Sequence, residues 1–273
     1  MSRLFVFGLG YAASAVANSA GGPVLGTTRD GRGGTIAFGD DDAVRAGLAA
    51  ATHVLSSVPP DGAEDPVLVR YGALLGGKWL GYLSSTGVYG DVGGAWVDES
   101  APIGGRRPSR NAADAAWLAA GARVFRLPGI YGPGRSPLER VAAGTAHRTG
   151  IAGQVFSRIH VADLARGVIA GFDAPRGAYN LSDDLPASQD AVVEHAAALL
   201  GVAAPPIVAL ADLSPAARAF YGENRRVANG KAKRVLGWRP LYADYRLGLR
   251  AVSATTSPTP ASAAPATASG DQR

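Results

Sequence analysis

Short apolar runs alternate with stretches of helical spacing along the first half of the chain. The run at 3–7, RLFVF, is almost wholly apolar, which is typical of a parallel strand buried on both faces. An Ala-rich stretch follows it and stops at two glycines. The alternation predicts a parallel sheet with crossover helices. We expect strands at 3–7, 23–28, 35–38, 52–57, 78–85 and 122–127, and helices at 11–20, 40–50, 66–75 and 109–120.

After residue 128 the pattern changes, and the loops become longer. Further helices are expected at 137–143, 161–171, 188–200 and 230–236, with a strand candidate at 206–210. This predicts a smaller C-terminal α/β lobe that is interleaved with the end of the main sheet. From Ser253 the chain has no large apolar residue, so it cannot offset its ordering entropy and is expected to be disordered. The expected units are 1–130, 131–252 and a tail at 253–273.

Composition narrows the choice of ligand. The chain has 273 residues, a net charge of +5 and a pI near 9.7, which favours anionic ligands. Its basic residues are spread out, apart from short clusters such as RRPSR and NRRVANGKAKR. This favours a solvated basic surface or a phosphate-bearing ligand over nucleic acid. We therefore expect a small-molecule substrate.

Several other functions are excluded or disfavoured. There is no cysteine, which rules out disulfides and thiolate chemistry, and the four histidines lack metal-ligand spacing, so no metal site is expected. No apolar run approaches the roughly 20 residues of a membrane span. The first residues resemble a strand more than a signal peptide, so a cytoplasmic location is expected. The sequence leaves a homo-oligomer open.

The segment GLGYAA, directly after the first strand, has the spacing of a dinucleotide-binding turn. Gly8 permits the tight turn, Gly10 lets the backbone approach a pyrophosphate, and the small Ala13 lets helix and strand pack closely. Tyr11 begins the helix, whose free N–H groups suit an anion. A merely Gly-rich turn is the alternative, but the strand–turn–helix context favours a dinucleotide site.

The end of the second strand bears on the choice between NADP and NAD. An acidic residue there would accept a hydrogen bond from the ribose 2′-OH of NAD, whereas arginine suits the 2′-phosphate of NADP. Thr28 and Arg29 occupy this zone and Asp30 follows. The planar guanidinium of Arg29 favours NADP. NAD is the alternative, with Arg29 in solvent and Asp30 in contact with the ribose.

Hydroxyl side chains end the fourth and fifth expected strands. Ser84, Ser85 and Thr86 close the fifth strand, although such residues compete for backbone hydrogen bonds and favour turns. They either cap the strand end or contact nicotinamide and substrate. Ligands of open α/β sheets bind at the carboxyl ends of the strands, which favours contact. For the same reason three residues after the fourth strand are expected to line the cofactor pocket: Ser56, Ser57 and Val58.

Six segments together resemble the extended short-chain dehydrogenase/reductase family, the NAD(P)-dependent epimerase/dehydratase group. They are GLGYAA, SSTGVYGD, RLPGIYGPGR, RIHVADLARGVIAG, AYNLSDDLPAS and KAKRVLGWRPLYADYRLGLRA, and they occur in the right order from residue 1 to about 252. The resemblance implies a Rossmann domain, that is, a doubly wound parallel sheet that binds NAD(P). It also implies a C-terminal lobe that closes over a substrate, often a nucleotide sugar. Pro128, Gly129 and Ile130 then match the segment that meets the nicotinamide.

The resemblance also assigns catalytic positions. Ser85 stands four residues before Tyr89, where the family holds the reacting oxygen, and Thr86 adjoins it. The family's Tyr-x-x-x-Lys pair is missing, because no Tyr or Lys occurs from 97 to 117. With Asp114 placed where the family often has Glu, the two slots fall on Arg106 and Arg110. Arg110 can replace the positive charge beside the ribose, but Arg106 is a poor proton shuttle at neutral pH.

The sequence thus predicts an oxidoreductase or epimerase/dehydratase-like enzyme with an altered catalytic set, NADP favoured and NAD possible as cofactor. The alternative is a non-catalytic NADP-binding sensor or scaffold. Tyr89 and Tyr131 are expected to line the substrate pocket, with packing as their alternative role. His160 and Asp163 are expected to dock the lobe rather than to relay protons. An anionic substrate could contact Arg225, Arg226 and Lys231, although a solvated basic surface is favoured there.

Overall fold

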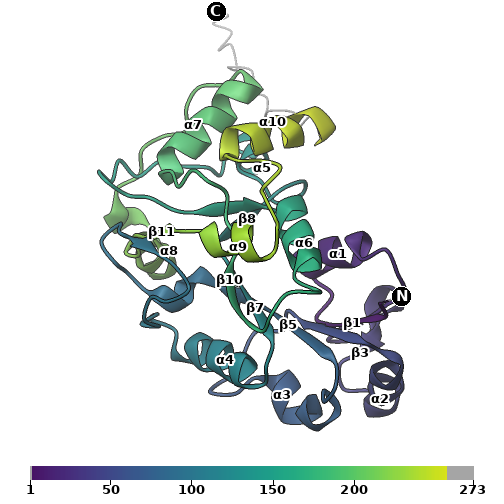
Figure 1. Cartoon of the computed structure of the whole chain (residues 1–273). Coiled ribbons are helices and arrows are strands. Elements are labelled where there is room, and N and C mark those ends of the chain that lie inside the picture. Colours follow the sequence, from purple (N-terminus) through teal and green to yellow (C-terminus); the bar gives the residue numbers. More distant parts are fainter. Residues whose placement is uncertain (1, 257–273) are drawn as a thin grey trace, which may run out of the picture.

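A computed structural model describes residues 2–256, and it contains a seven-stranded parallel sheet flanked by helices (Figure 1). The strand order is β10-β7-β5-β4-β1-β2-β3. This is the doubly wound order, in which the chain moves outward from β1 in one direction and then in the other. The strands are β1 Leu4–Phe7, β2 Val24–Thr28, β3 Ile36–Ala37, β4 His53–Ser56, β5 Trp79–Ser85, β7 Arg123–Leu127 and β10 Gly177–Asn180. The predicted fold class is confirmed.

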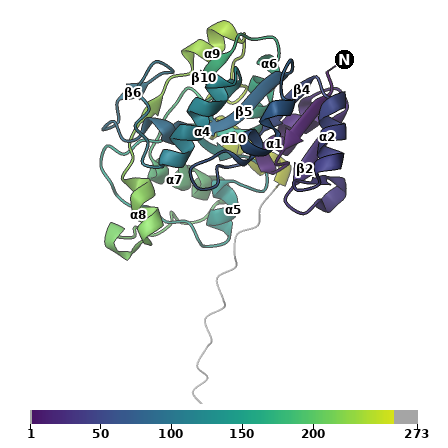
Figure 2. The same ribbon diagram turned by 90° about the horizontal axis from the view of Figure 1, so that it is seen from below.

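The two faces of the sheet carry separate apolar cores. Successive side chains of a strand point to opposite faces, so Leu4 and Val6 join one core while Phe5 and Phe7 join the other. Helices α1 and α6 pack together over the first face, and α2, α3 and α4 cover the second (Figures 1 and 2). The helix bounds are α1 Tyr11–Ser19, α2 Asp41–Ala50, α3 Pro66–Tyr71, α4 Pro108–Ala119 and α6 Val161–Ala170.

Most boundaries follow the local signals that the sequence carries. Asp40 caps α2 by accepting a hydrogen bond from the N–H of Ala43, and Asp65 caps α3, which begins at Pro66. The described residues also form four short 3₁₀ turns, at η1 Arg32–Gly34, η2 Gly72–Leu74, η3 Thr86–Tyr89 and η4 Leu210–Asp212.

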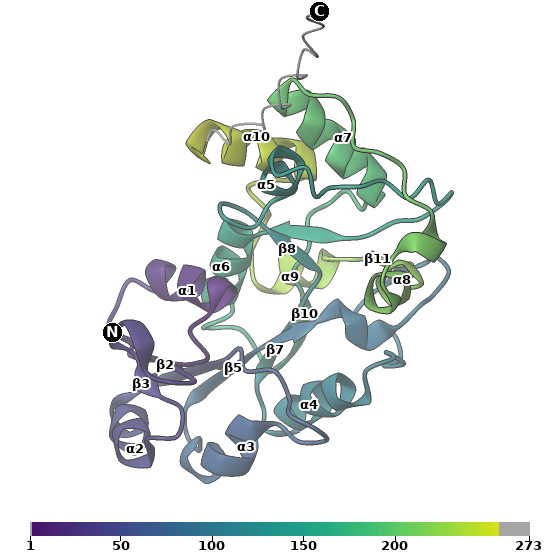
Figure 3. The same cartoon turned by 180° about the vertical axis from the view of Figure 1, so that it is seen from behind.

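The C-terminal lobe stands over the carboxyl ends of the strands (Figure 3). Its own apolar core joins α5, α7 and α10, and two small two-stranded sheets pair β8 with β9 and β6 with β11. The helices are α5 Pro137–Ala142, α7 Gln189–Leu200, α8 Pro215–Tyr221, α9 Gly230–Val235 and α10 Tyr245–Thr256; the strands are β6 Trp96–Val97, β8 Gly129–Tyr131, β9 Arg158–His160 and β11 Arg226–Val227.

Two predictions for the lobe are wrong. The strand expected at 206–210 is only a single bridge between Arg148 and Ile207, because Pro205 and Pro206 have no N–H to extend a ladder. Disorder does not begin at Ser253, since 253–256 form the end of α10, where Val252 is buried in the lobe core. Residues 257–273 of the expected tail lie outside the described residues. No helix within 2–256 is long and apolar enough to cross a membrane.

Candidate functional site

Two adjoining cavities open at the carboxyl ends of the strands. The first, called the β1–β2 cavity, has a volume of about 630 Å³ and is lined by Gly8, Leu9, Gly10, Thr27, Thr28, Arg29, Arg32, Phe38, Ser57, Val58, Pro59, Pro60, Asp61 and Pro66.

The second, called the β5–β7 cavity, measures about 640 Å³. It shares Gly10 and Ser57 with the first, so the two cavities adjoin there and are together called the trough. Its other lining residues are Tyr11, Ala12, Leu83, Ser84, Ser85, Thr86, Gly87, Arg106, Arg107, Arg110, Leu127, Pro128, Gly129, Ile130, Arg135, Phe156, Ser157, Arg158, Gln189, Phe220, Glu223, Arg225 and Val227.

The glycines of the GLGYAA turn have different structural roles. Gly8 has a φ of 77°, and a Cβ there would lie 3.0 Å from Val58 Cγ2 and 3.1 Å from Ser57 Oγ. Gly8 is therefore needed by the fold itself. At Gly10 a Cβ would meet no atom within 4 Å, because this position faces the trough. The space at Gly10 is thus available to a ligand.

The amino-terminal end of α1 points its backbone donors at this space. Gly10 is the N-cap residue and offers no side chain to the first-turn N–H groups. Ala13 is fully buried against the sheet, which allows close packing of helix and strand. An anion at the helix end would meet both free N–H groups and the positive end of the helix dipole. A pyrophosphate fits this arrangement.

The end of β2 presents guanidinium groups to the β1–β2 cavity. Arg29 and Arg32 both line it and are exposed, and neither forms a salt bridge within residues 2–256. Asp30 is not among the lining residues, and it accepts a hydrogen bond from the Thr28 hydroxyl at 3.3 Å. A sugar phosphate here would thus meet two cations. Arg32 was missed by sequence reasoning, which looked only at the strand end.

The hydroxyl groups at the end of β5 differ in their surroundings. Ser84 is buried and donates to Asp114 Oδ2 at 2.6 Å. Ser85 lines the β5–β7 cavity, and its Oγ accepts from the N–H of Gly87 at 3.1 Å, which caps η3. This bond leaves the Ser85 hydroxyl free to donate a proton to a ligand. Thr86 also lines the cavity but is only 4% exposed.

A buried ion pair lies behind the serines and was not foreseen. Arg126 in β7 binds both carboxylate oxygens of Asp114 in α4, at 2.8 and 3.1 Å, and the two side chains are 3% and 0% exposed. Arg126 also donates to Tyr89 Oη at 3.0 Å, and Tyr89 donates to Asn180 at 2.7 Å. Tyr89 is therefore held inside this network and does not line either cavity. The charged residue in the apolar run RVFRL was the available sequence signal.

Arginines dominate the wall of the β5–β7 cavity. Glu223 is the carboxylate among its lining residues, against six guanidinium groups. Arg158 is buried, and its nearest acceptors are backbone carbonyls and the Gln189 side chain. Such a wall favours an anionic ligand. The six are Arg106, Arg107, Arg110, Arg135, Arg158 and Arg225.

The chain is similar in sequence to two known proteins. No protein-family model matches it. A 3-diazoavenalumate denitrifying reductase from a Streptomyces species is 30% identical over 138 residues, which are 46% of this chain and 45% of that enzyme. A conserved protein of unknown function from Silicibacter pomeroyi is 39% identical over 93% of this chain and 99% of that one, with a TM-score of 0.82. The chain belongs to the same family as the Silicibacter protein.

More distant structures bear on the fold of this family. The human epimerase family protein SDR39U1, solved with NADPH, is 18% identical over 93% of this chain and 99% of its own, with a TM-score of 0.75. The dTDP-glucose 4,6-dehydratase of Bacillus anthracis, solved with NAD, is 17% identical over 92% and 95%, with a TM-score of 0.73. The predicted resemblance to epimerase/dehydratase enzymes of the short-chain dehydrogenase/reductase type is confirmed at the level of the fold.

The structure brings most of the predicted site residues of this family member together. Gly10, Tyr11, Ser57, Ser85, Thr86, Arg110, Pro128, Gly129 and Ile130 line the β5–β7 cavity, and Gly8, Thr28, Arg29 and Val58 line the β1–β2 cavity. Ala13 and Ser56 are fully buried beneath the trough. Of the basic residues near 225–231, only Arg225 lines a cavity, whereas Arg226 donates to Gly94 O and Lys231 donates to Ala178 O.

Tyr131 lies in the lobe and does not line either cavity. Its ring meets His160 edge-on at 5.3 Å and packs against Gly248, where a Cβ would lie 2.0 Å from Tyr131 Oη. Asp163 accepts from the N–H groups of Leu241 and Tyr242, which ties α6 to the segment before α10. These contacts join segments of the lobe to one another and to α6, which is the docking role predicted for His160 and Asp163.

Asp183 is a buried carboxylate, and no side chain within residues 2–256 donates a hydrogen bond to its oxygens. Burial raises the pKa of Asp183 to about 8, although Arg158 and the backbone N–H of Leu185 act in the opposite direction. The folded state therefore holds a proton between about pH 4 and 8 that the unfolded state releases. Since the folded-state pKa is the higher one, this group makes stability fall as pH rises through that window.

We expect Asp183→Asn to remove this pH dependence. The difference in unfolding free energy between variant and wild type should move in favour of the variant by up to about 1.4 kcal/mol per pH unit between pH 5 and 8. Urea unfolding at several pH values measures it, and Asp42→Asn, an exposed carboxylate of α2, is the control. A difference that stays constant with pH would show that Asp183 is ionised in the fold.

Proposed function

We propose that this chain is an NADP-dependent oxidoreductase of the epimerase/dehydratase type, acting on a small anionic carbonyl or hydroxyl compound. The observation that carries the proposal is the trough, whose two cavities adjoin at Gly10 and Ser57. The NADPH in the human SDR39U1 structure and the reductase activity named for the Streptomyces relative support it. Nucleotide sugars belong among the candidate substrates, because the B. anthracis enzyme is named for one.

The residues present fit NADP along the trough. Arg29 and Arg32 would hold the 2′-phosphate, and the free N–H groups of α1 would hold the pyrophosphate beside Gly10. Pro128 and Gly129, after β7, would contact the nicotinamide. NADPH supplies the hydride when bound, and the cavity wall around it is made by β5 and β7.

The chain's own side chains would orient the substrate and stabilise the negative charge that develops on it. Ser85 Oγ donates to the substrate oxygen, and Arg110 stabilises negative charge that develops there. Tyr11 is the phenol that lines this cavity, and its hydroxyl donates to Pro133 O at 3.0 Å. Burial raises the pKa of Tyr11, which keeps it protonated at neutral pH. It is the candidate proton donor in place of the missing family tyrosine, once a substrate oxygen replaces Pro133 O as the acceptor of its hydrogen bond.

The test begins with cofactor binding and continues with turnover. Fluorescence titration should give tighter binding of NADPH than of NADH. NADPH oxidation should then appear with a member of a panel of aromatic, carboxylate-bearing and nucleotide-sugar carbonyl compounds, and Ser85→Ala should lower kcat more than it raises KM. Binding of neither dinucleotide would overturn the proposal. Tight NADPH binding without turnover on any member would favour the non-catalytic sensor instead.

We expect replacement of both Arg29 and Arg32 by alanine to abolish the preference for NADP. Each guanidinium bound to a phosphate contributes roughly 1.5–3 kcal/mol, so the loss of both should raise the Kd for NADPH at least about 100-fold. The Kd for NADH should change less than about threefold. Arg45→Ala, an exposed arginine of α2 outside both cavities, controls for the loss of charge. An equal loss for both dinucleotides would place the 2′-phosphate elsewhere.

A further inference from the structure

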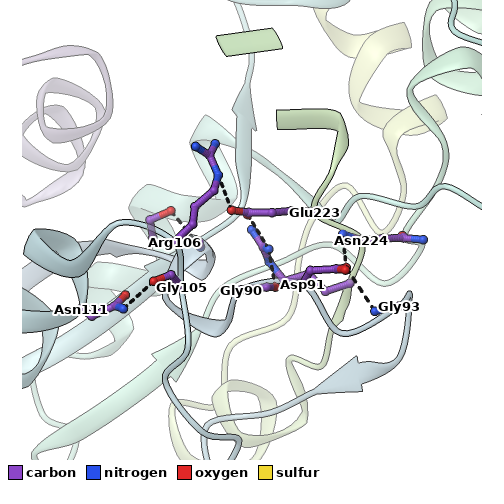
Figure 4. A network of polar contacts seen from close by, with 11 residues as sticks. Gly90, Asp91, Gly93, Gly105, Arg106, Asn111, Glu223 and Asn224 are labelled. Atoms are coloured by element: carbon purple, nitrogen blue, oxygen red, sulfur yellow. Dashed lines mark hydrogen bonds and ion pairs between the residues drawn. The ribbon is translucent and has the colours of Figure 1, made fainter. Parts of the chain in front are cut away.

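Three charged side chains form a bridge at the β5–β7 cavity. Arg106 Nε donates to Glu223 Oε1 at 2.6 Å, and Arg225 Nη1 donates to Glu223 Oε2 at 2.7 Å. Each oxygen of one carboxylate is therefore held by a different guanidinium. Figure 4 shows the bond between Arg106 and Glu223. Arg106 precedes α4 on the sheet side, whereas the other two follow α8 in the lobe. The bridge thus joins the two parts of the chain across the cavity.

The bridge lies beside the end of β5. A Cβ at Gly87 would be 3.2 Å from Ser85 Oγ and 3.9 Å from Arg225 Nη2. The guanidinium of Arg225 and the hydroxyl of Ser85 therefore lie on either side of the same small space. The loop that carries Arg106 approaches the same point, since a Cβ at Gly105 would be 2.2 Å from Gly87 O. A group bound between Arg106 and Arg225 would therefore be close to Ser85.

The surroundings of the Glu223 carboxylate are those expected of a site that binds a ligand carboxylate. The Glu223 side chain is 14% exposed, that of Arg225 is 15% exposed and that of Arg106 is 41% exposed. It is the one carboxylate among the described residues that line this cavity, and it faces an excess of arginines. A ligand carboxylate could take both of its hydrogen bonds, because the two groups have the same charge and the same planar shape.

An aromatic surface adjoins the bridge. Phe156 and Phe220 both line the cavity, and their rings stack at 4.7 Å with an interplanar angle of 21°. Phe220 is 49% exposed and lies three residues before Glu223. An exposed ring in a cavity wall favours an aromatic or apolar ligand, because burying it removes apolar surface from water.

We propose that Arg106 and Arg225 bind the carboxylate of an aromatic substrate, and that Glu223 fills this site until the substrate displaces it. This inference rests on the proposed function and names the substrate class. The exchange replaces one carboxylate by another at the same two guanidinium groups, so the hydrogen bonds are conserved. The net gain comes from contact between the substrate ring and Phe220, while Glu223 moves into water.

Benzoate, with its uncharged analogue benzamide, tests the proposal by calorimetry on the full chain. Glu223→Gln should raise the affinity for benzoate at least about tenfold, because a neutral amide competes poorly for two guanidinium groups. The affinity for benzamide should stay within about twofold. Adding Arg106→Gln to Glu223→Gln should abolish the gain. Glu194→Gln removes a carboxylate from an exposed pair with Arg148 outside the cavity, and it should leave benzoate affinity unchanged.

Two outcomes would overturn the inference: benzoate affinity in Glu223→Gln equal to that of wild type, or an equal gain for benzamide. If Glu223→Gln does not fold, Glu223→Asp supplies the second variant, and its shorter side chain should give a smaller gain. NADPH is titrated into the same samples. Failure of wild type to bind NADPH counts against the proposed function, whereas the benzoate comparison needs no dinucleotide, so the two failures are distinguishable.

Discussion

Gly10→Val is expected to abolish NADPH binding while leaving the fold intact. Its side chain would enter the space beside the first turn of α1, where no protein atom lies within 4 Å of the position of a Cβ. That space is where the backbone must approach the pyrophosphate. The Kd for NADPH should rise at least about 100-fold, which corresponds to about 2.7 kcal/mol. Fluorescence titration measures the affinity.

The stability of the variant shows whether Gly10→Val blocks the binding site or unfolds the protein. Gly10 has a φ of −93°, which valine adopts, so the loss of stability should be only about 1 kcal/mol for a less favourable N-cap residue. Gly8→Val is the matched contrast, because a φ of 77° and the contacts with Val58 and Ser57 make valine strained there. Thermal unfolding should show a much larger loss for Gly8→Val. Unimpaired NADPH binding by Gly10→Val would contradict the assignment of the trough.

Arg126→Met is expected to destabilise the protein by about 3–5 kcal/mol, because it leaves Asp114 as an unpaired buried carboxylate. Burial alone would lower the pKa of Arg126, but its bonds with Asp114 raise it above the usual value, so Arg126 keeps its charge. The same change removes the donor to Tyr89 Oη. Urea unfolding measures the loss.

The double variant Asp114→Leu/Arg126→Met provides the decisive comparison. Since apolar residues can replace a buried ion pair with little cost, the double variant should be more stable than either single variant. Glu194→Gln breaks the exposed pair with Arg148 and should cost less than about 1 kcal/mol. Additive losses in the double variant would show that the two charges are not coupled.

Much of the fold could be predicted because its signals are local. The wholly apolar run at β1, the glycines at 8 and 10, Asp40 before α2 and Pro66 at the start of α3 each act on their immediate neighbours. The lobe was less predictable, because its elements are short and depend on packing. α8, α10 and the β6–β11 pair were not foreseen, and the apolar run at 206–210 did not form a strand.

Some residues of the candidate site could likewise be predicted from local sequence signals, and others could not. The turn at Gly8 and Gly10, the serine at 85 and Arg29 could be found because motif spacing and strand ends place them. Arg32 and Glu223 belong to no motif, and Arg135 and Arg158 stand at the ends of segments that gave them no role in the site. These four residues line the trough only because segments distant in the sequence converge on it. Tyr89 and Tyr131 belong to expected motifs, yet buried networks hold them away from the cavities.

The sequence by itself determined the parallel sheet, the crossover helices and the dinucleotide-binding turn, since hydrophobic period and glycine position are properties of neighbouring residues. Only the tertiary structure decided which charges are paired. Asp114 and Arg126 are separated by 12 positions and Arg106 and Glu223 by 117, and both distances are below 3 Å. Pairing depends on where the fold brings side chains together and on how much water it excludes, and neither quantity is a property of a short segment of sequence.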